Sequence, residues 1–430
     1  MMRFRSLCFL MLLLLPACAD NPASLQMVTA ESLVTPTVTM VPTETAVLPA
    51  SEATIEPALT LSVWLPESIA PTNNQAAKLV LASQVDNFQA SESGLTVSLR
   101  LKKESGTGGL MATLLSASDV ALGALPDLTL IHREDLRTAV QAGLAQPLEG
   151  RLSSAVMADF YSAAVQLGQI NGRLYGLAYA LEIEHVAYQS PSADYAHFDS
   201  VLSGGRPLVV PVGQATGISD VFLVQYLAAG GSVVGNHLGA LNVEALRTVL
   251  NFYEQAIDAG VIDPGVLNYP TPQDYQAGLV DGRITAAVVT SSMYLDLLTA
   301  GKKLEIAPIP TSSDTPSTLV DGWMWIMTAK DASRQDAARR FLEWVFDPGR
   351  QGAYTHAIAM LPSTKAAMRG WGTISYGDFA GDLLANAVLP LDNTESDSTA
   401  RALQNALVAV ISGERTAADA VQDVVDQLAG

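Results

Sequence analysis

The chain has 430 residues, of which 43 are acidic and 24 are basic, so its formal net charge is −19. This excess of carboxylates argues against nucleic acid as a partner, because phosphate binding needs Lys and Arg to replace released counterions. Hydrophobic residues make up 49% of the chain, which is enough for a large globular core, and the length favours roughly two to three domains.

The first residues have the parts of a secretory signal peptide, which we assign to residues 1–18. Arg3 and Arg5 supply the charged start. The apolar run over residues 7–15 is too short to span a bilayer as a stable helix. The segment is therefore predicted to be a leader rather than a domain.

The end of this leader, residues 15–18 (LPAC), resembles the lipobox of bacterial lipoproteins. The resemblance implies that Cys18 is lipidated and becomes the mature N-terminus. The alternative is an ordinary secretory cleavage near residues 17–19, with Cys18 incidental. We favour lipidation because the other cysteine, Cys8, lies inside the leader, which leaves Cys18 without a disulfide partner in the mature chain.

Residues 19–58 are rich in Thr, Pro, Ala and Glu. Pro36, Pro42, Pro49 and Pro57 exclude a regular helix or a central strand and favour an extended, solvated backbone. The segment carries glutamates but no Lys or Arg, which should keep it off an anionic membrane surface. We predict a disordered tether that holds a folded body away from the membrane.

The folded body is predicted to begin with alternating strands and helices. Residues 59–66 (LTLSVWLP) are typical of a strand, residues 74–91 place apolar side chains at helical spacing, and residues 95–101 alternate as a second strand. A helix over 110–123 and a strand over 126–131 follow. Strand, helix and strand in this order predict a parallel sheet with crossover helices.

Two later helices carry recognisable end signals. One is predicted to start after Asn242 as N-cap and to stop at Gly260. The other is predicted to begin at Ser333, with Asp336 in capping-box spacing, and to stop at Pro348. Both are expected to be core helices, since nothing in them demands chemistry.

The order of these segments resembles extracellular solute-binding proteins of the maltose-binding type, the receptors that feed ABC importers. The resemblance covers 59–430. It rests on five features. The first is a Pro-Asp strand with its following helix, and the second is the segment where the family's chain passes from the first lobe to the second, which ends here at Tyr188-Gln189 where the family has Tyr-Asn. The others are a segment similar to the family's GxxAM, a strand and helix followed by Leu-Pro, and C-terminal amphipathic helices. These pieces are residues 124–149, 170–189, 278–295, 319–368 and 403–430.

The resemblance implies an α/β protein with the two-lobed periplasmic-binding-protein type II fold and a ligand cleft between the lobes. It assigns 59–178 and 290–346 to the N-terminal lobe, and 179–289 and 347–430 to the C-terminal lobe. In such a fold, loops and helix N-termini at the carboxyl ends of both sheets face one crevice. Closing the lobes on a solute would remove water and create the shape that a membrane partner recognises.

Glu182 is the first expected ligand contact, since the family often places a ligand-facing carboxylate shortly before the Tyr188-Gln189 position. A buried carboxylate needs donors, and ligand hydroxyls can supply them. The alternative is a surface or hinge residue that is hydrogen-bonded within the protein. Trp323, beside Asp321 at the strand end, is expected either to line the cleft or to pack in the core, whereas Trp325 is expected in the core.

Further candidates follow from the same resemblance. Tyr294 occupies a position where family members often carry an aromatic that stacks on the ligand. Glu134 corresponds to a polar contact of the first lobe, where the family's aromatic is replaced by Ile131 or His132, and this departure argues against a maltodextrin-like ligand. The set is completed by three aromatic residues that core packing would also explain: Trp64, Trp371 and Tyr179.

Aromatic faces beside carboxylates suit sugars, whose C–H faces stack while their hydroxyls take hydrogen bonds. The same set could hold a cationic or peptide-like solute. No metal or cofactor is expected. The five histidines have no zinc-site spacing, residues 106–109 lack the Lys of a P-loop, and no G-x-S-x-G nucleophile motif occurs.

The sequence thus predicts a lipid-anchored receptor on the extracytoplasmic face of the cytoplasmic membrane, held there through Cys18. It would act as a monomer and deliver a small solute, expected to be a carbohydrate, to the permease subunits of an ABC importer without covalent chemistry. Two alternatives stay open. One is a ligand-sensing lipoprotein for a membrane signalling partner, and the other, less favoured, is a secreted glycoside-active enzyme with a carboxylate pair.

Overall fold

The computed structural model describes residues 59–429, apart from 71, 121, 214–216, 373 and 393. The predicted signal peptide over 1–18, the lipidated Cys18 and the tether over 19–58 lie outside the described residues. No helix within the described ranges is both long enough and apolar enough to cross a bilayer.

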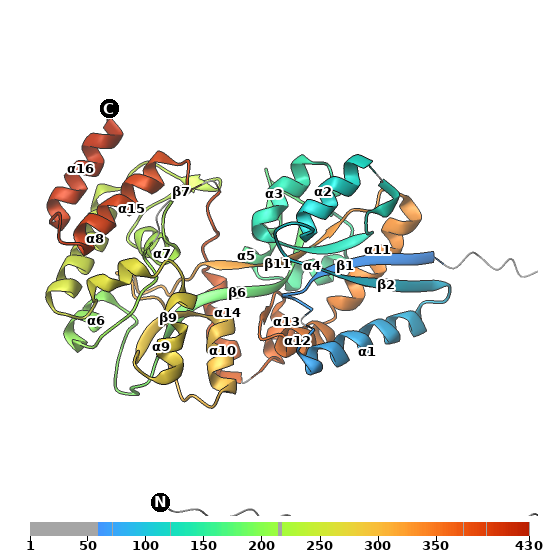
Figure 1. Ribbon diagram of the computed structural model, residues 1–430, viewed down its shortest axis with the longest axis horizontal. Coiled ribbons are helices and arrows are strands. Elements are labelled where there is room, and N and C mark those ends of the chain that lie inside the picture. The colour runs from blue at the N-terminus through green and yellow to red at the C-terminus, as the bar shows by residue number, and fades with distance from the viewer. Residues whose placement is uncertain are drawn as a thin grey trace, which may run out of the picture. The chain divides into compact units, whose positions relative to one another are not determined.

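The body begins with a parallel sheet, as predicted. Strand β1 (Leu59–Pro66) pairs in parallel with β2 (Leu95–Lys102) on one side and with β3 (Leu128–His132) on the other. Helices α1 (Gln75–Ser91) and α2 (Leu110–Val120) make the crossovers (Figure 1). The predicted alternation of strand and helix is therefore confirmed in this part of the chain.

Two antiparallel strands extend this sheet toward the other half of the molecule. Strand β11 (Val320–Met327) pairs with β3, and the long strand β6 (Gly176–Tyr188) pairs with β11. Beyond β11, strand β6 continues and pairs with β9 (Ala286–Thr290) and β10 (Glu305–Ala307). Strand β6 is thus shared by two sets of neighbours, one at each of its ends.

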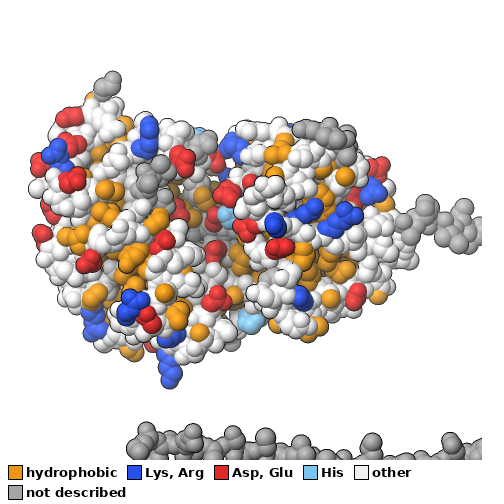
Figure 2. Space-filling view, in the orientation of Figure 1, with side chains coloured by type: hydrophobic (Ala, Val, Ile, Leu, Met, Phe, Trp, Pro, Cys, Tyr) orange, Lys and Arg blue, Asp and Glu red, His pale blue; other side chains and the backbone are white. Residues whose placement is uncertain are grey.

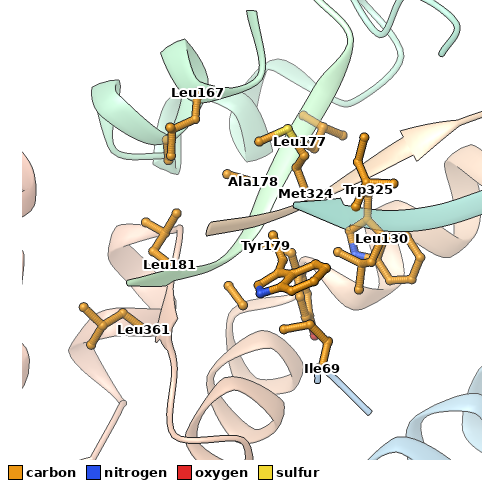
Figure 3. Packing of buried hydrophobic residues seen from close by; sticks show 14 of the residues in the cluster. Ile69, Leu130, Leu167, Leu177, Ala178, Tyr179, Leu181, Met324, Trp325 and Leu361 are labelled. Carbon is orange, nitrogen blue, oxygen red and sulfur yellow. The ribbon is translucent and has the colours of Figure 1, made fainter. Parts of the chain in front are cut away.

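The buried hydrophobic side chains form two clusters, and we call the parts of the chain packed on them the first and the second lobe. The first core lies around β1, β3, β11 and the start of β6, and it runs on beneath β9. Figure 3 shows Tyr179 and Trp325 among its members. The helices of the second core include α7 (Asp220–Ala228), α8 (Val243–Asp258), α15 (Ser398–Ile411) and α16 (Ala417–Ala429), and α6 (Phe198–Gly204) adds Phe198 and Val201.

Figure 1 shows the two lobes side by side, with β6 and β11 between them. The structure therefore has the predicted two-lobed α/β fold. The remaining helices are α3 (Arg133–Gln141), α4 (Ser154–Asp159), α5 (Ser162–Leu167), α9 (Gln276–Asp281), α10 (Ser291–Thr299), α11 (Ala332–Val345), α12 (Pro348–Ala357), α13 (Lys365–Arg369) and α14 (Ile374–Ala385). The remaining strands are β4 (Gln169–Ile170), β5 (Arg173–Leu174), β7 (Val233–Val234), β8 (His237–Leu238) and β12 (Leu361–Pro362).

The predicted boundaries of the lobes stay a prediction, but one segment packs differently from that assignment. Helices α12, α13 and α14 fall in the part assigned to the C-terminal lobe, 347–430. Their buried side chains Tyr354, Met368 and Tyr376 belong to the first core, whereas α15 and α16 pack in the second. The chain thus returns to the first lobe before it ends in the second.

The helix ends follow local chemistry. Asn242 caps α8 as predicted, because its side chain accepts a hydrogen bond from the Ala245 N–H at 3.1 Å, and Gly260 follows the helix with a φ of 68°. The predicted start of α11 at Ser333 is wrong. Asp331 is the N-cap, since its carboxylate accepts from the N–H groups of Ser333 and Arg334, and the helix begins at residue 332.

Pro348 does not only end a helix. It opens α12, with the Asp347 side chain accepting from the Arg350 N–H at 3.2 Å. Proline fits the first turn of a helix, because its missing N–H would have no intrahelical partner there. Two helices therefore meet at this point, where the sequence pattern predicted only a stop.

Candidate functional site

The antiparallel pairing of β6 and β11 places acidic side chains on one face of the sheet. Glu182 on β6 lies directly opposite Asp321 on β11, and side chains directly opposite in an antiparallel pair share a face. Glu184 stands two residues farther along β6, which puts it on the same face. Trp323 shares this face too, because it lies two residues after Asp321 and opposite Ala180.

The two strands approach each other closely here because β11 carries a glycine. A Cβ atom at Gly322 would lie 2.3 Å from the carbonyl oxygen of Ala180, a distance that real Cβ atoms do not adopt. The backbone of β6 thus occupies the space that a side chain at Gly322 would need. This glycine holds the strand that carries Asp321 and Trp323 against the strand that carries Glu182.

His132 joins three of the predicted site residues. It ends β3 and precedes α3, and its Nε2 lies 3.5 Å from Oδ2 of Asp321. Its Nδ1 lies 3.9 Å from Oε1 of Glu134, and its ring meets the edge of the Trp323 ring with centroids 5.0 Å apart. The structure therefore brings Glu134, Asp321 and Trp323 together around a histidine that the sequence analysis considered only as a substitute for an aromatic residue.

Glu182 has a hydrogen-bonding partner from α10. The hydroxyl of Ser292 donates to Oε1 of Glu182, and the Ser292 and Thr290 hydroxyl oxygens lie 3.0 Å apart. Thr290 ends β9 and caps α10, because its side chain accepts from the Met293 N–H. The first turn of α10 therefore brings polar side chains up to β6 beside Glu182.

Asp220, the first residue of α7, completes the acidic group from the second lobe. Desolvation raises its pKa to about 6, and the negative charge of Asp321 adds to the shift. Asp220 is nevertheless exposed to solvent. A carboxylate that is both accessible and crowded by protein lies in a hollow rather than on a convex surface, and Figure 2 shows such a hollow between the lobes, with acidic side chains and a histidine in it.

Glu184 is the most buried carboxylate of the group. Burial raises its pKa well above the ordinary value, and the charges of Asp220 and Glu182 raise it further. Its Oε2 atom is buried and has no hydrogen-bond partner. We call Glu182, Glu184, Asp220 and Asp321 the carboxylate cluster.

A second polar contact joins the lobes, and we call it the interlobe contact. Arg137 on α3 donates a hydrogen bond to Oδ2 of Asp392, and Arg133 lies 3.6 Å from Oδ1 of the same carboxylate. Asn236, between β7 and β8 of the second lobe, donates from Nδ2 to Asp392 at 3.0 Å and accepts at its carbonyl from the Asp392 N–H at 2.9 Å. Two arginines of the first lobe thus meet a carboxylate held by the second.

Tyr294 lies on the other face of β6. Its ring packs against His185, with centroids 5.2 Å apart, and against Tyr376 at 4.7 Å. His185 follows Glu184 by one residue, so the two side chains point to opposite faces of the strand. Burial lowers the pKa of His185 to about 4, which keeps it neutral, and its Nε2 lies 3.0 Å from the Tyr376 hydroxyl.

Three further predicted site residues lie in the first core. Tyr179 packs against Trp325 with ring centroids 6.0 Å apart, as Figure 3 shows. Trp371 exposes 2% of its surface and meets Tyr376. Trp64 lies buried on β1, two strands away from β11, beneath the ammonium of Lys102. The structure does not bring these side chains to the carboxylate cluster, and their contact with a ligand stays a prediction.

Sequence reasoning missed several residues that the fold brings to this region. Glu184 had a signal, since two glutamates separated by one residue in a strand share a face. Asp220, Asp392 and the two arginines of α3 had none, because only the tertiary fold places them here. Within the described ranges, no group of three or more His, Cys, Asp or Glu side chains is arranged to hold a metal ion.

Comparison with solved structures shows the same architecture. The cyclic α-maltosyl-1,6-maltose binding protein of Arthrobacter globiformis superposes with a TM-score of 0.68 at 17% identity, over 86% of this chain and 98% of that one. The sugar-binding protein MalE of Xanthomonas citri gives a TM-score of 0.66 at 15% identity, over 85% and 95% of the two chains. At such identities the likeness concerns the fold.

Comparison of the sequence with other proteins also finds binding proteins. A binding protein of Brucella abortus (strain 2308) is 21% identical over 314 residues, which is 67% of this chain and 76% of the relative. A binding protein of Brucella suis biovar 1 matches to the same extent. The model of the bacterial extracellular solute-binding protein family matches residues 83–371, more than half of the chain. The protein therefore belongs to the family of bacterial extracellular solute-binding proteins.

Proposed function

We propose that the protein is a lipid-anchored receptor that binds a carbohydrate between its two lobes and delivers it to an ABC importer. The observation that carries this proposal is the position of Glu182 opposite Asp321 in the antiparallel pair of β6 and β11, which lies between the two lobes. Polar side chains from both lobes meet around this point. A solute bound there would contact both lobes at once, so its binding would favour their closure.

The choice of a carbohydrate rests on the chemistry of the site and on the fold neighbours. Carboxylates accept hydrogen bonds from sugar hydroxyls, and the Ser292 hydroxyl can both donate and accept. Of the two solved structures described above, one is named as a cyclic α-maltosyl-1,6-maltose binding protein and the other as a sugar-binding protein. Among the predicted contacts, we propose Glu182, Asp321, Trp323 and Glu134 as the leading ones, and Tyr294, Trp64, Trp371 and Tyr179 as secondary.

The interlobe contact provides a means for closure. Arg133 and Arg137 come from the first lobe, and Asn236 holds their carboxylate partner Asp392 on the second. Domains that close around a ligand are stabilised by contacts that form only in the closed state. We propose that this contact holds the closed form. The permease of an ABC importer would recognise that form, and ATPase subunits on other chains would supply the energy for transport.

We further propose that residues 1–18 are a signal peptide, that Cys18 carries the lipid and that residues 19–58 are the tether. The protein would then act as a monomer on the extracytoplasmic face of the membrane and bind its solute without covalent chemistry. Replacement of Cys18 by Ser should release the protein from the membrane fraction of the expressing cell, whereas retention there would count against the anchor.

The test of the binding proposal is a thermal-shift screen of the whole chain with mono- and oligosaccharides, amino acids and amines. A ligand that binds only the folded protein raises its Tm by mass action, by an amount that grows with concentration. Glu182→Gln should abolish the shift, and Asp86→Asn, an exposed carboxylate on α1, should leave it unchanged. Shifts given only by amino acids or by amines without a sugar ring would contradict the proposal of a carbohydrate.

A further inference from the structure

The carboxylate cluster lacks compensating positive charge. Within the described part of the chain, Glu182, Glu184 and Asp220 make no ion pair with a Lys, Arg or His side chain, whereas Asp321 has His132 at 3.5 Å. Burial lowers the pKa of Arg133 and the negative charge of Asp321 opposes this shift, but Arg133 forms its ion pair with Asp392. Three acidic groups therefore stand close together without a cation of the protein between them.

One polar atom of the cluster and one on the residue that precedes Asp220 are buried and have no hydrogen-bond partner. Oε2 of Glu184 has no hydrogen-bond partner, although the residue exposes only 9% of its surface. The hydroxyl of Ser219, which precedes Asp220 at the start of α7, is fully buried and also has none. Leaving such groups unpaired costs free energy, so a missing partner is expected to come from outside the chain.

Protonation of Glu184 would not remove this need. A neutral carboxyl group still carries an O–H that requires an acceptor and oxygens that require donors. A neutral solute could satisfy the hydrogen bonds through its hydroxyls, but it would leave the repulsion among the carboxylates in place. An ammonium group supplies three N–H donors and a positive charge together.

We propose that the solute carries a positively charged amino group and that Glu182, Glu184 and Asp220 hold this group. This inference rests on the proposed function, because it concerns the same hollow between the lobes. Two sources share the chemistry, an amino sugar with a free amine and a diamine without a sugar ring. The Ser292 hydroxyl, beside Glu182, would contact the rest of the solute, whereas Trp323 packs against His132 with 7% of its surface exposed.

The test compares matched probes with the whole chain at about pH 6.5, where an aliphatic amine is charged. The probes are the β-1,4-linked disaccharide of glucosamine, its N,N′-diacetyl form, maltose and 1,4-diaminobutane. Calorimetric titration should give at least about tenfold tighter binding for an amine than for the diacetyl disaccharide and maltose, since hydrogen bonds between charged groups are the stronger ones. Added salt should weaken the binding of the amine more than that of a neutral sugar.

Isosteric variants show which carboxylates bind the amino group of the solute. Glu184→Gln and Asp220→Asn should each weaken binding of the amine by about tenfold or more, because each keeps the shape of the side chain and removes a carboxyl group that can ionise beside an ammonium. Asp86→Asn provides the matched control on the outside of the first lobe and should change nothing. A Glu184→Gln protein that unfolds cooperatively but no longer prefers the amine would support the inference, since loss of fold would then not explain the result.

The outcomes separate this inference from the proposed function. Binding of maltose or the diacetyl disaccharide with no preference for an amine would overturn the inference and leave the carbohydrate proposal standing. Binding of 1,4-diaminobutane but of neither disaccharide nor maltose would support the inference and overturn the carbohydrate proposal. Absence of binding by both amines overturns the inference, whatever the neutral sugars do.

Discussion

Arg137 and Asp392 connect the two lobes through a direct hydrogen bond, and Asp392 is fixed from the other side by Asn236. The pair is partly shielded from water, with the Asp392 side chain 12% and the Arg137 side chain 29% exposed. A charged contact in such surroundings is screened less than one on the open surface. The equilibrium between closed and open lobes is therefore expected to depend on these two residues.

Arg137→Ala and Asp392→Ala should each weaken solute binding by about 5- to 30-fold, because each removes the contact that we propose holds the closed form. The double variant should lose little more than either single one, since both changes remove the same contact. Calorimetric titration of the three variants measures this. Fully additive losses would show that the residues act on binding separately.

The pH dependence of stability should reflect the carboxylate cluster. The pKa of Asp220 is raised to about 6 in the folded protein, above its value in the unfolded chain. The folded state then binds more protons between about pH 4 and 6, so the free energy of unfolding contributed by this group is present at low pH and lost as the pH rises through 6. Urea denaturation of the ligand-free protein from pH 5 to 7 should show this loss.

Asp220→Asn should reduce this slope without abolishing it, because desolvation also raises the pKa of Asp135 to about 6. The same substitution should make the ligand-free protein more stable at pH 7, since it removes a charge from a crowded site. A variant with the unaltered slope would mean that Asp220 titrates near the ordinary value of an aspartate.

The close pairing of β11 with β6 depends on Gly322. A Cβ atom there would lie 2.3 Å from the Ala180 carbonyl oxygen, so Gly322→Ala should push β11 away from β6 and lower the free energy of unfolding by about 1–3 kcal/mol. Gly204→Ala, at the end of α6 with no atom within 4 Å of the new Cβ, is the control. It should be neutral or slightly stabilising. Equal effects of the two substitutions in urea denaturation would refute the steric argument.

The core of the first lobe should matter for folding and not for the ligand. Trp325 packs against Tyr179 and Phe341, so Trp325→Ala should cost about 3–5 kcal/mol of stability. The fraction that remains folded should bind the solute with unchanged affinity. Trp323→Phe should do the reverse, with a small loss of stability and weaker binding, because Trp323 faces His132 beside the carboxylate cluster. Denaturation and titration of both variants distinguish the two roles.

The sequence predicted the features that depend on local pattern. The parallel start of the sheet followed from strands and helices in alternation, and the cap at Asn242 followed from its side chain and position. The cap of α11 was misplaced because Asp331 and Ser333 are both good capping residues, and only the backbone geometry decides between them. Element type was thus easier to predict than element boundary.

The site was predictable only in part, for a physical reason. Glu182 could be proposed because the resemblance placed its segment at the crossing between the lobes, and Asp321 because it lies beside Trp323 at a strand end. Their direct opposition depends on the strand register, and Asp220 joins them only through the fold of the second lobe. The interlobe contact brings together residues from α3, from the β7–β8 turn and from the segment after α14, which no sequence pattern links.

The proposed function requires one solute to contact both lobes beside the paired strands β6 and β11. Hydrogen–deuterium exchange of the whole chain, with and without the solute that gives the largest thermal shift, locates those contacts. Exchange should slow in the presence of the solute in all three of the segments 180–185, 219–222 and 319–324, which come from both lobes. Protection confined to one lobe, or located away from these three segments, would contradict the proposed function.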